Sequence, residues 1–296
     1  MSQRIAVIGL GSMGYGMAQS CVRAGLRVHG IDVVPEAAQR FVAEGGDGTP
    51  LDDVASALDA VVVVVLNAAQ VETVLFGDAG LVPKLREGAV VLACATVPPD
   101  FARDMEARCT EQGVLYLDAP ISGGAAKAAA GKLSIMASGG AAAFAAAAPV
   151  LEATAETVFR LGDAAGAGSA MKAVNQMLAG VHIAAMAEAL TFGLTQNIAP
   201  VTFLDVISKC AGTSWMLENR APHVVEGDYS PRSQVNIWPK DLGIVLEAAR
   251  AVGFDAPLTQ TALEQYAQAV EMGLGGQDDA AVAKVYAERS GLALPK

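Results

Sequence analysis

The amino-acid sequence predicts an α/β fold, in which a doubly wound parallel sheet is followed by an all-α C-terminal domain. Short β-rich runs alternate with helical patterns as far as Arg160, and most of these runs are continuously apolar, like the five valines at 61–65. Continuous apolar runs are typical of parallel strands that are buried on both faces. No strand-rich run follows Arg160. We therefore place a domain boundary near Gly162, which gives domains of residues 1–162 and 163–296.

The elements of the first domain follow from its apolar runs and the turn residues between them. The predicted strands are residues 4–8, 27–31, 61–66, 89–93, 114–118, 133–137 and 158–160. The predicted helices are residues 13–24, 35–44, 51–58, 71–76, 99–112 and 141–151. Gly25 and Gly113 stand where C-terminal helix caps belong. Repeated strand–helix units of this kind place helices on both faces of an open parallel sheet.

The second domain is predicted to begin with one long interdomain helix. Residues 166–168 form a turn, Ser169 is a suitable N-cap, and no proline interrupts residues 170–197. Further helices are predicted over residues 200–208, 215–224, 241–252, 257–272 and 278–290.

Composition and charge exclude several classes of protein. The hydrophobic share of 53% is too high for a disordered chain, and the net charge of −11 disfavours nucleic acid and anionic membranes as partners. No run of about 18 strongly apolar residues is evident, so no membrane span is expected. The four cysteines lack C-x-x-C spacing, and the start of the chain lacks a signal-peptide pattern. These features predict a reduced, cytoplasmic protein, and they leave a small anionic substrate possible.

A glycine-rich segment predicts a dinucleotide site. Gly9-Leu10-Gly11-Ser12-Met13-Gly14 fits G-x-G-x-x-G, follows the first strand and opens a helix, and Asp32 ends the second strand. In a Rossmann domain, Gly9 makes the tight turn, Gly11 admits the pyrophosphate and Gly14 lets helix and strand pack closely. Asp32 accepts hydrogen bonds from the adenosine ribose and repels a 2′-phosphate, which favours NAD over NADP. The alternatives are a glycine-rich turn without a ligand and, for Asp32, an ordinary turn residue.

Other chemistries find no support in the sequence. No tyrosine has a lysine four positions on, and the three histidines lack metal-ligand spacing, so no metal site is predicted. What remains is Lys172, with Asn175 and Gln176 three and four residues later on one face of an otherwise apolar helix. The alternative is an exposed lysine near a helix start.

Four separated blocks give the chain a family resemblance. They are Gly9-Leu10-Gly11-Ser12-Met13-Gly14, Asp118-Ala119-Pro120-Ile121-Ser122-Gly123-Gly124, Gly168-Ser169-Ala170-Met171-Lys172-Ala173-Val174-Asn175 and Lys240-Asp241-Leu242. In order and spacing, the chain resembles the β-hydroxyacid dehydrogenase family, which includes 3-hydroxyisobutyrate and 6-phosphogluconate dehydrogenases.

The resemblance implies roles for residues of these blocks. The Ser122-Gly123-Gly124 segment would hold the substrate carboxylate, and Lys172 would be the catalytic acid/base. Asn175 would position the substrate, and Lys240 would lie near the nicotinamide and the substrate. Oxidation of an alcohol requires a base within reach of its hydroxyl proton, and a lysine with a lowered pKa can serve. Further residues expected to touch the cofactor are Leu66, Asn67 and Thr96.

Within the family, residues 214–220, 228–229 and 240–243 resemble the L-threonate dehydrogenase branch, which oxidises the 2-hydroxyl of a four-carbon sugar acid with NAD. Asn175, Lys240 and Asp241 are the candidate partners for its other hydroxyls. The family also implies a homo-oligomer, a dimer or a tetramer. The alternatives are a 3-hydroxyisobutyrate or tartronate semialdehyde enzyme, an imine reductase, and a non-catalytic dinucleotide-binding module. Ser122, Lys172 and Asn175 together weigh against the last two.

Overall fold

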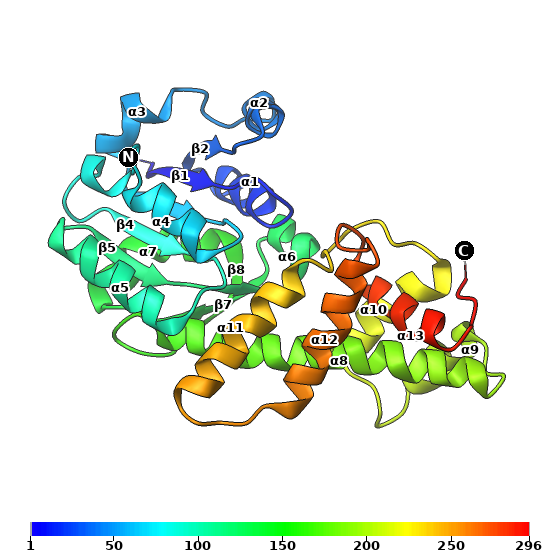
Figure 1. The fold of residues 1–296 in the computed structure, drawn as a ribbon. Helices are drawn as coiled ribbons and strands as arrows, with labels where there is room; N and C mark the ends of the chain where they lie inside the picture. Colours follow the sequence, from blue (N-terminus) through cyan, green and yellow to red (C-terminus); the bar gives the residue numbers. More distant parts are fainter. Residues whose placement is uncertain (1, 296) are drawn as a thin grey trace. The chain divides into compact units, whose positions relative to one another are not determined.

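The computed structural model describes residues 2–295, which form two compact units, one ending at Lys172 and one beginning at Ala173. The first unit contains a five-stranded parallel sheet with the order β2-β1-β3-β4-β5 (Figure 1). Its strands are β1 (Arg4–Ile8), β2 (Arg27–Ile31), β3 (Ala60–Val63), β4 (Val90–Ala93) and β5 (Leu115–Asp118). The described part of the second unit is helical, so the predicted α/β class with an all-α second half is confirmed.

The strand register brings the carboxyl ends of the strands to one edge of the sheet. Ile8 at the end of β1 pairs with Ile31 and with Val63, and the ends of β4 and β5 pair in the same way. The chain runs from β1 to β2 on one side and returns to β3 on the other, so the topology reverses at β1. Ligands of open α/β sheets bind outside the carboxyl ends at such a switch point.

Helices cover both faces of this sheet, as predicted for a doubly wound fold. Along β1, Ile5 and Val7 join one hydrophobic core, whereas Ala6 and Ile8 join the other, because successive side chains of a strand point to opposite faces. The first core is covered by α1 (Gly14–Arg23), α2 (Pro35–Ala43), α6 (Gly124–Ala130) and α7 (Ala141–Thr154). The second is covered by α3 (Leu51–Val54), α4 (Ala68–Phe76), α5 (Pro99–Glu111) and the short helices η1 (Ala55–Ala57) and η2 (Val82–Lys84).

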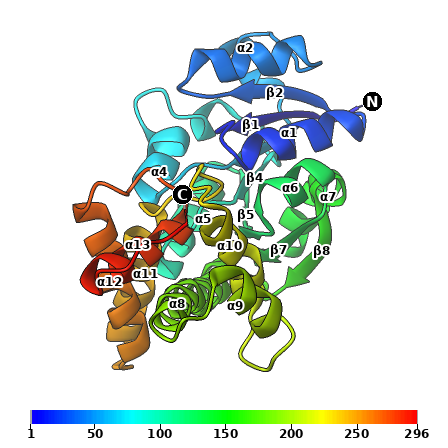
Figure 2. The same cartoon turned by 90° about the vertical axis from the view of Figure 1, so that its right-hand side faces the viewer.

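A small second sheet completes the first unit. It contains β6 (Ile121–Ser122), β7 (Leu133–Ala137) and β8 (Ala155–Arg160), with β6 antiparallel and β8 parallel to β7. Figure 2 shows β7 and β8 side by side. An isolated bridge between Asp118 and Ser138 joins it to the end of β5. The sequence patterns did not predict β6 or α6, because a two-residue strand carries no periodicity and the two elements are separated only by Gly123.

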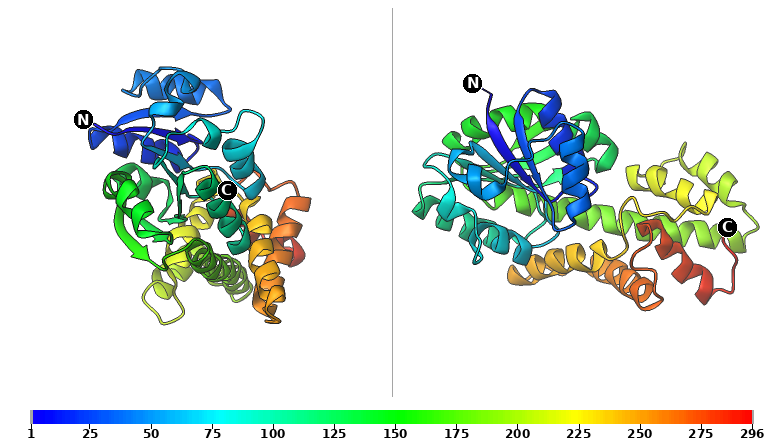
Figure 3. Two further views of the ribbon diagram at one scale, coloured as in Figure 1. Left: turned by 90° about the vertical axis from the view of Figure 1, so that its left-hand side faces the viewer. Right: turned by 90° about the horizontal axis from the view of Figure 1, so that it is seen from above.

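The second unit is built on the long helix α8 (Ala167–Thr195), whose first turns belong to the first unit. Figure 2 shows α8 end on, and the right-hand view of Figure 3 shows it from the side. The helix begins at Ala167, so the prediction of Ser169 as its N-cap was wrong. By length and composition α8 could cross a membrane, so the expectation that no apolar run is long enough was wrong, and half of its apolar window is buried. The other helices are α9 (Pro200–Ile207), α10 (Trp215–Glu226), α11 (Ile237–Ala251), α12 (Pro257–Glu271), η3 (Asp279–Val282) and α13 (Ala283–Arg289).

A glycine lets α11 approach α8 closely. A Cβ on Gly180 would lie 2.8 Å from Leu242 Cδ2 and 3.0 Å from Trp238 Cε3, so a larger residue would push α11 away. The Tyr266 hydroxyl donates to the Gly180 carbonyl over 2.8 Å, and the Trp238 and Tyr266 rings stack with centroids 5.5 Å apart. The first turns of α11 are thus packed tightly within the second unit.

The N-terminus of α8 is held by a buried carboxylate from the end of β5. Asp118 Oδ2 accepts hydrogen bonds from the amides of Gly166 and Ser169, at 2.9 and 2.8 Å, and Asp118 Oδ1 accepts from the Ser169 hydroxyl at 2.7 Å. Burial raises the pKa of Asp118, and the hydrogen bonds from Ser169, Gly166 and Ser138 oppose that rise. The carboxylate satisfies amides that helix geometry leaves without partners.

Replacing this carboxylate is expected to destabilise the fold strongly. Asp118→Ala would leave the buried amides of Gly166 and Ser169 unpaired. At roughly 1–3 kcal/mol for each of these two buried donors, the loss in unfolding free energy is about 2–6 kcal/mol. Urea denaturation measures it, with the exposed Asp163→Ala as the matched control, expected to change stability by less than about 0.5 kcal/mol. Equal stability of the two variants would show that Asp118 does not anchor α8.

Candidate active site

The glycine-rich loop between β1 and α1 has a conformation that two of its glycines make possible. Gly9 has φ +95°, and a Cβ there would lie 2.3 Å from the Val64 carbonyl oxygen. A Cβ on Gly14 would lie 1.8 Å from the carbonyl oxygen of Gly9. Gly9 and Gly14 are therefore required by the turn and by close packing of the helix on the strand, as predicted.

Gly11 differs, because nothing in the protein requires a glycine there. No protein atom lies within 4 Å of the position that its Cβ would occupy, so packing would tolerate a side chain. Leu10, Gly11 and Ser12 line a pocket of about 440 Å³ beside the first turn of α1, where helix geometry leaves amide groups without intrahelical acceptors. Open space next to free amides suits a pyrophosphate, so these residues fit a dinucleotide.

Asp32 lies directly after β2 and contacts the same loop. Asp32 Oδ2 accepts a hydrogen bond from the Leu10 amide at 2.6 Å, and Oδ1 accepts from the Val34 amide at 2.8 Å. Each carboxylate oxygen can accept more than one hydrogen bond, so capacity remains for ribose hydroxyls. Asp32 therefore helps to hold the loop as well as offering negative charge at the carboxyl edge of the sheet.

The other residues expected at the cofactor follow neighbouring strands at this edge. Leu66 is exposed, and its amide donates to Gln70 Oε1. Asn67 is the N-cap of α4, since its side-chain oxygen accepts from the Gln70 amide at 2.9 Å. Thr96 is half-buried beyond the end of β4. The three lie on the loops that follow β3 and β4, and a local structural role is evident for Asn67.

Lys172 is bound to the segment that precedes Ser122. The Lys172 ammonium donates a hydrogen bond of 2.9 Å to the carbonyl oxygen of Ile121, 51 residues earlier in the chain. Gly123 and Gly124 have φ angles of +136° and +79°, which only glycine adopts readily, so both are needed where β6 turns into α6. Lys172 is 8% exposed. The structure thus brings together the predicted catalytic lysine and the predicted carboxylate-binding segment.

The predicted polar residues of the second unit form a connected group. The Lys240 ammonium lies 2.5 Å from Asp241 Oδ1 in an ion pair, and Gln176 Nε2 donates to Asp241 Oδ2 over 2.5 Å. Asn175 Nδ2 donates to Gln176 Oε1 over 2.9 Å. Asp241 is 2% exposed, and each of its oxygens contacts a neighbouring side chain. Its contact with substrate hydroxyls stays a prediction. Gln176 was not predicted as a site residue, although its i+4 spacing from Lys172 indicated the shared helix face.

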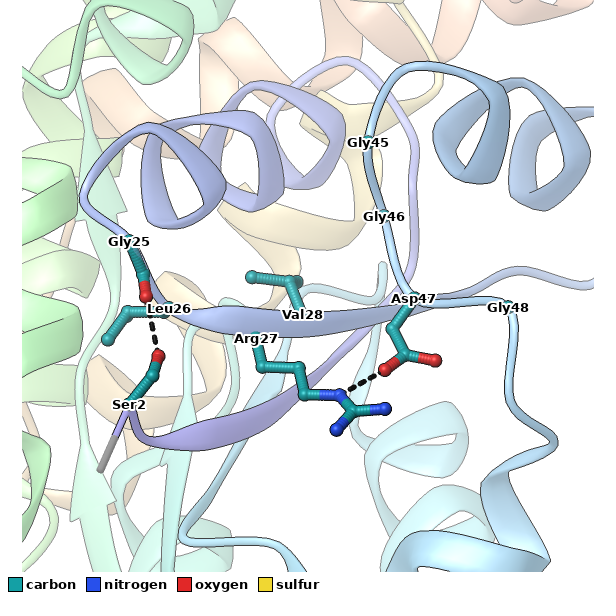
Figure 4. Close-up of a pocket in the computed structure, with 9 residues that line it drawn as sticks. All are labelled: Ser2, Gly25, Leu26, Arg27, Val28, Gly45, Gly46, Asp47 and Gly48. Carbon is teal, nitrogen blue, oxygen red and sulfur yellow. Dashed lines mark hydrogen bonds and ion pairs between the residues drawn. The ribbon is translucent and has the colours of Figure 1, made fainter.

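A second pocket lies at the opposite edge of the sheet, where β1 and β2 begin (Figure 4). Its volume is about 530 Å³, and glycine backbone forms much of its lining. Its polar side chains already have partners, because the Ser2 hydroxyl donates to the Gly25 carbonyl and Arg27 pairs with Asp47. Figure 4 shows both contacts within the pocket wall. It is therefore unrelated to the loops that carry the predicted cofactor residues.

Comparison with known proteins agrees with this geometry. Residues 4–162 match the model of the NAD-binding domain of 6-phosphogluconate dehydrogenase, and residues 166–286 match that of the NAD-binding domain of NADP-dependent 3-hydroxyisobutyrate dehydrogenase. The chain is 50% identical to the L-threonate dehydrogenase of Cupriavidus necator, over 100% of this chain and 99% of that one. It is 46% identical to the L-threonate dehydrogenase of Haemophilus influenzae, over 99% and 97%.

A solved structure extends the similarity to three dimensions. The crystal structure of a protein from Salmonella typhimurium, described as 3-hydroxyisobutyrate dehydrogenase, superimposes with a TM-score of 0.91 at 45% identity, covering 96% of this chain and all of that one. Both family models describe nicotinamide dinucleotide-binding domains. The chain therefore belongs to the 3-hydroxyisobutyrate dehydrogenase-like family and is a hydroxyacid dehydrogenase that uses a nicotinamide dinucleotide.

Proposed function

We propose that this enzyme oxidises the 2-hydroxyl of L-threonate to 2-oxo-tetronate with NAD, and that Lys172 is its general acid/base. The observation that carries this proposal is the hydrogen bond from Lys172 to the carbonyl of Ile121. This hydrogen bond holds Lys172, the proposed base, next to the residue that precedes Ser122. The Ser122 hydroxyl and the amides of Gly123 and Gly124 are the proposed donors to the substrate carboxylate. The similarity to L-threonate dehydrogenases across the whole chain supports the choice of substrate.

The proposed reaction requires the removal of a proton and a hydride from one secondary alcohol. Bound NAD supplies the hydride acceptor. A neutral Lys172 amine keeps a hydrogen for the Ile121 carbonyl and directs its lone pair to the substrate hydroxyl, from which it takes the proton. In the reverse direction the Lys172 ammonium polarises the ketone and returns the proton. Asn175 and Lys240 provide polar partners for the remainder of the sugar acid.

The same proposal assigns roles to the two domains. Residues 1–162 bind NAD, through the Gly9–Gly14 loop, Asp32, Leu66, Asn67, Thr96 and Lys240 from the second domain. Residues 163–296 complete the substrate site and form a homo-oligomer, a dimer or a tetramer. Exposed apolar side chains on α8, such as Val174, Leu178 and Phe192, support contacts between subunits. The acidic net charge of −11 supports an enzyme that binds neither nucleic acid nor anionic membranes, and the scattered cysteines support a cytoplasmic location.

A second candidate function is oxidation of 3-hydroxyisobutyrate. It is favoured by the description of the Salmonella typhimurium protein, which is as similar to this chain as several L-threonate dehydrogenases are. The two substrates share a carboxylate and a hydroxyl, and they differ in the polarity of what remains. Side chains that hydrogen-bond the additional hydroxyls of L-threonate, such as Asn175, would therefore distinguish the two substrates.

Loss of Lys172 is expected to abolish most turnover. Lys172→Ala should lower kcat by roughly 10²–10⁴-fold, the usual effect of removing a general acid/base. The dissociation constant of NADH, measured by fluorescence, should change little, because the glycine loop and Asp32 lie elsewhere. The exposed Lys132→Ala serves as the matched control. Near-normal turnover of Lys172→Ala would remove lysine from the mechanism.

Cofactor preference should depend on the charge of Asp32. Asp32→Ser is expected to lower the ratio of kcat/KM for NAD over NADP by at least about tenfold, or 1.4 kcal/mol. Because Asp32 also holds the Leu10 amide, Asp32→Asn is the second variant, which removes charge while retaining an acceptor. Both variants should shift the ratio. A wild-type preference for NADP would contradict the role given to Asp32.

Substrate choice is tested by comparing two acids on the wild-type enzyme. A site that hydrogen-bonds hydroxyls leaves those groups unpaired when it binds a methyl-branched acid. We expect kcat/KM, measured by NADH absorbance, to be at least about 10²-fold higher for L-threonate than for 3-hydroxyisobutyrate. Comparable values would refute the threonate proposal and leave the family and the lysine mechanism intact.

A further inference from the structure

The hydrogen-bonded group in the second unit is a linear chain with a charged group at one end. Lys240 pairs with Asp241 Oδ1, Asp241 Oδ2 accepts from Gln176, and Gln176 Oε1 accepts from Asn175. Gln176 and Asp241 are 7% and 2% exposed, whereas Asn175 is half-buried. The chain therefore begins in an ion pair whose carboxylate is buried and ends at a side chain that can contact a ligand.

The direction of every hydrogen bond in this chain follows from the chemistry of Asp241. A carboxylate has no hydrogen to donate, so the Gln176 amide must turn its NH₂ group toward Asp241. The Gln176 carbonyl oxygen then faces Asn175, which must donate a hydrogen bond from its own NH₂ group. Two amides that could each adopt either orientation in isolation are thus held in one orientation. The Lys240 ammonium pairs with the other oxygen of the Asp241 carboxylate.

One consequence concerns the free end of the chain. Because Asn175 Nδ2 faces Gln176, its carbonyl oxygen Oδ1 faces away from it. Within residues 2–295 no protein donor reaches this oxygen. Asn175 follows Lys172 by three residues on α8, so both side chains project from one face of the helix. The amide therefore presents an acceptor on the face that carries the proposed base.

We propose that Gln176 and Asp241 are positioning residues that fix Asn175 as a hydrogen-bond acceptor, and that this acceptor selects substrates with a hydroxyl beside the carbon that is oxidised. The chemical class is thus a polyhydroxy acid, because a hydroxyl donates to Oδ1 whereas an alkyl group leaves it unpaired. The proposal rests on the proposed function, in which Asn175 contacts the substrate. It assigns the selection to buried residues that touch no substrate themselves.

The test measures discrimination between two substrates that differ by one hydroxyl. The ratio of kcat/KM for L-threonate over 2,4-dihydroxybutanoate, which lacks the 3-hydroxyl, should be roughly 10²-fold or more in the wild type. Gln176→Met keeps the volume of the side chain but has no group that can orient Asn175. This variant should lower the ratio at least about tenfold, mainly through a higher KM for L-threonate. A merely structural role would lower kcat/KM for both acids equally and leave the ratio unchanged, which would overturn the proposal.

A double variant separates positioning from direct contact. Asn175→Leu should lower the ratio at least as much as Gln176→Met, and adding Gln176→Met to Asn175→Leu should cause no further fall, since both changes remove one interaction. Independent, additive effects would refute action through Asn175. Asp241→Asn, which lets the Gln176 amide take either orientation, should also lower the ratio, and an unchanged ratio in that variant would count against the proposal.

An exposed glutamine provides the control, and the activity of the wild type on L-threonate separates this proposal from the proposed function. Gln260, an exposed glutamine on α12 that pairs with Glu264, should give an unchanged ratio when replaced by methionine. If the wild type does not oxidise L-threonate, both proposals fail. If it does, and Gln176→Met retains the wild-type ratio, only the positioning role fails.

Discussion

The buried carboxylate of Asp118 is the interaction on which the arrangement of the predicted catalytic lysine and the Ser122–Gly124 segment depends. It ends β5, and its Oδ2 accepts from the amides of Gly166, just before α8, and Ser169, in its first turn. One side chain thus joins the edge of the sheet to the start of the long helix. A Cβ on Gly168 would lie 2.4 Å from the Met136 carbonyl oxygen, which shows how closely the helix start approaches the sheet. Ile121 lies three residues beyond Asp118, and Lys172 lies three residues beyond Ser169. Both partners of the Lys172–Ile121 hydrogen bond are therefore positioned from this one carboxylate.

The energetic balance at Asp118 explains why it has so many partners. Desolvation of a buried carboxylate disfavours its charged form and raises the pKa, whereas hydrogen bonds from Ser169, Gly166 and Ser138 favour that form. The partial positive charge of a helix N-terminus acts in the same direction as these bonds. Burying this one charge is unfavourable, but the buried carboxylate pairs with amides at the start of the helix that would otherwise be unpaired in the protein interior.

The polar residues of the second unit apply a related principle. Asp241 is an acceptor with no hydrogen to donate, and the orientation of each amide beyond it follows from that fact. The close packing of α11 on α8, which Gly180 permits, brings Asp241 within reach of Gln176. Helix packing as well as charge therefore sets the orientation of the Gln176 and Asn175 amides.

The sequence alone determined the features that depend on local pattern. Apolar runs predicted the five parallel strands, the glycine spacing predicted the dinucleotide loop, and motif order predicted Lys172 and the Ser122–Gly124 segment. Partners far apart in the chain were decided only by tertiary structure. Asp118, rather than Ser169, supports the start of α8, and Asp241 accepts a hydrogen bond from the Gln176 amide. Hydrogen-bond partners 51 or 65 residues apart leave no periodic trace, because their meeting depends on how whole elements pack.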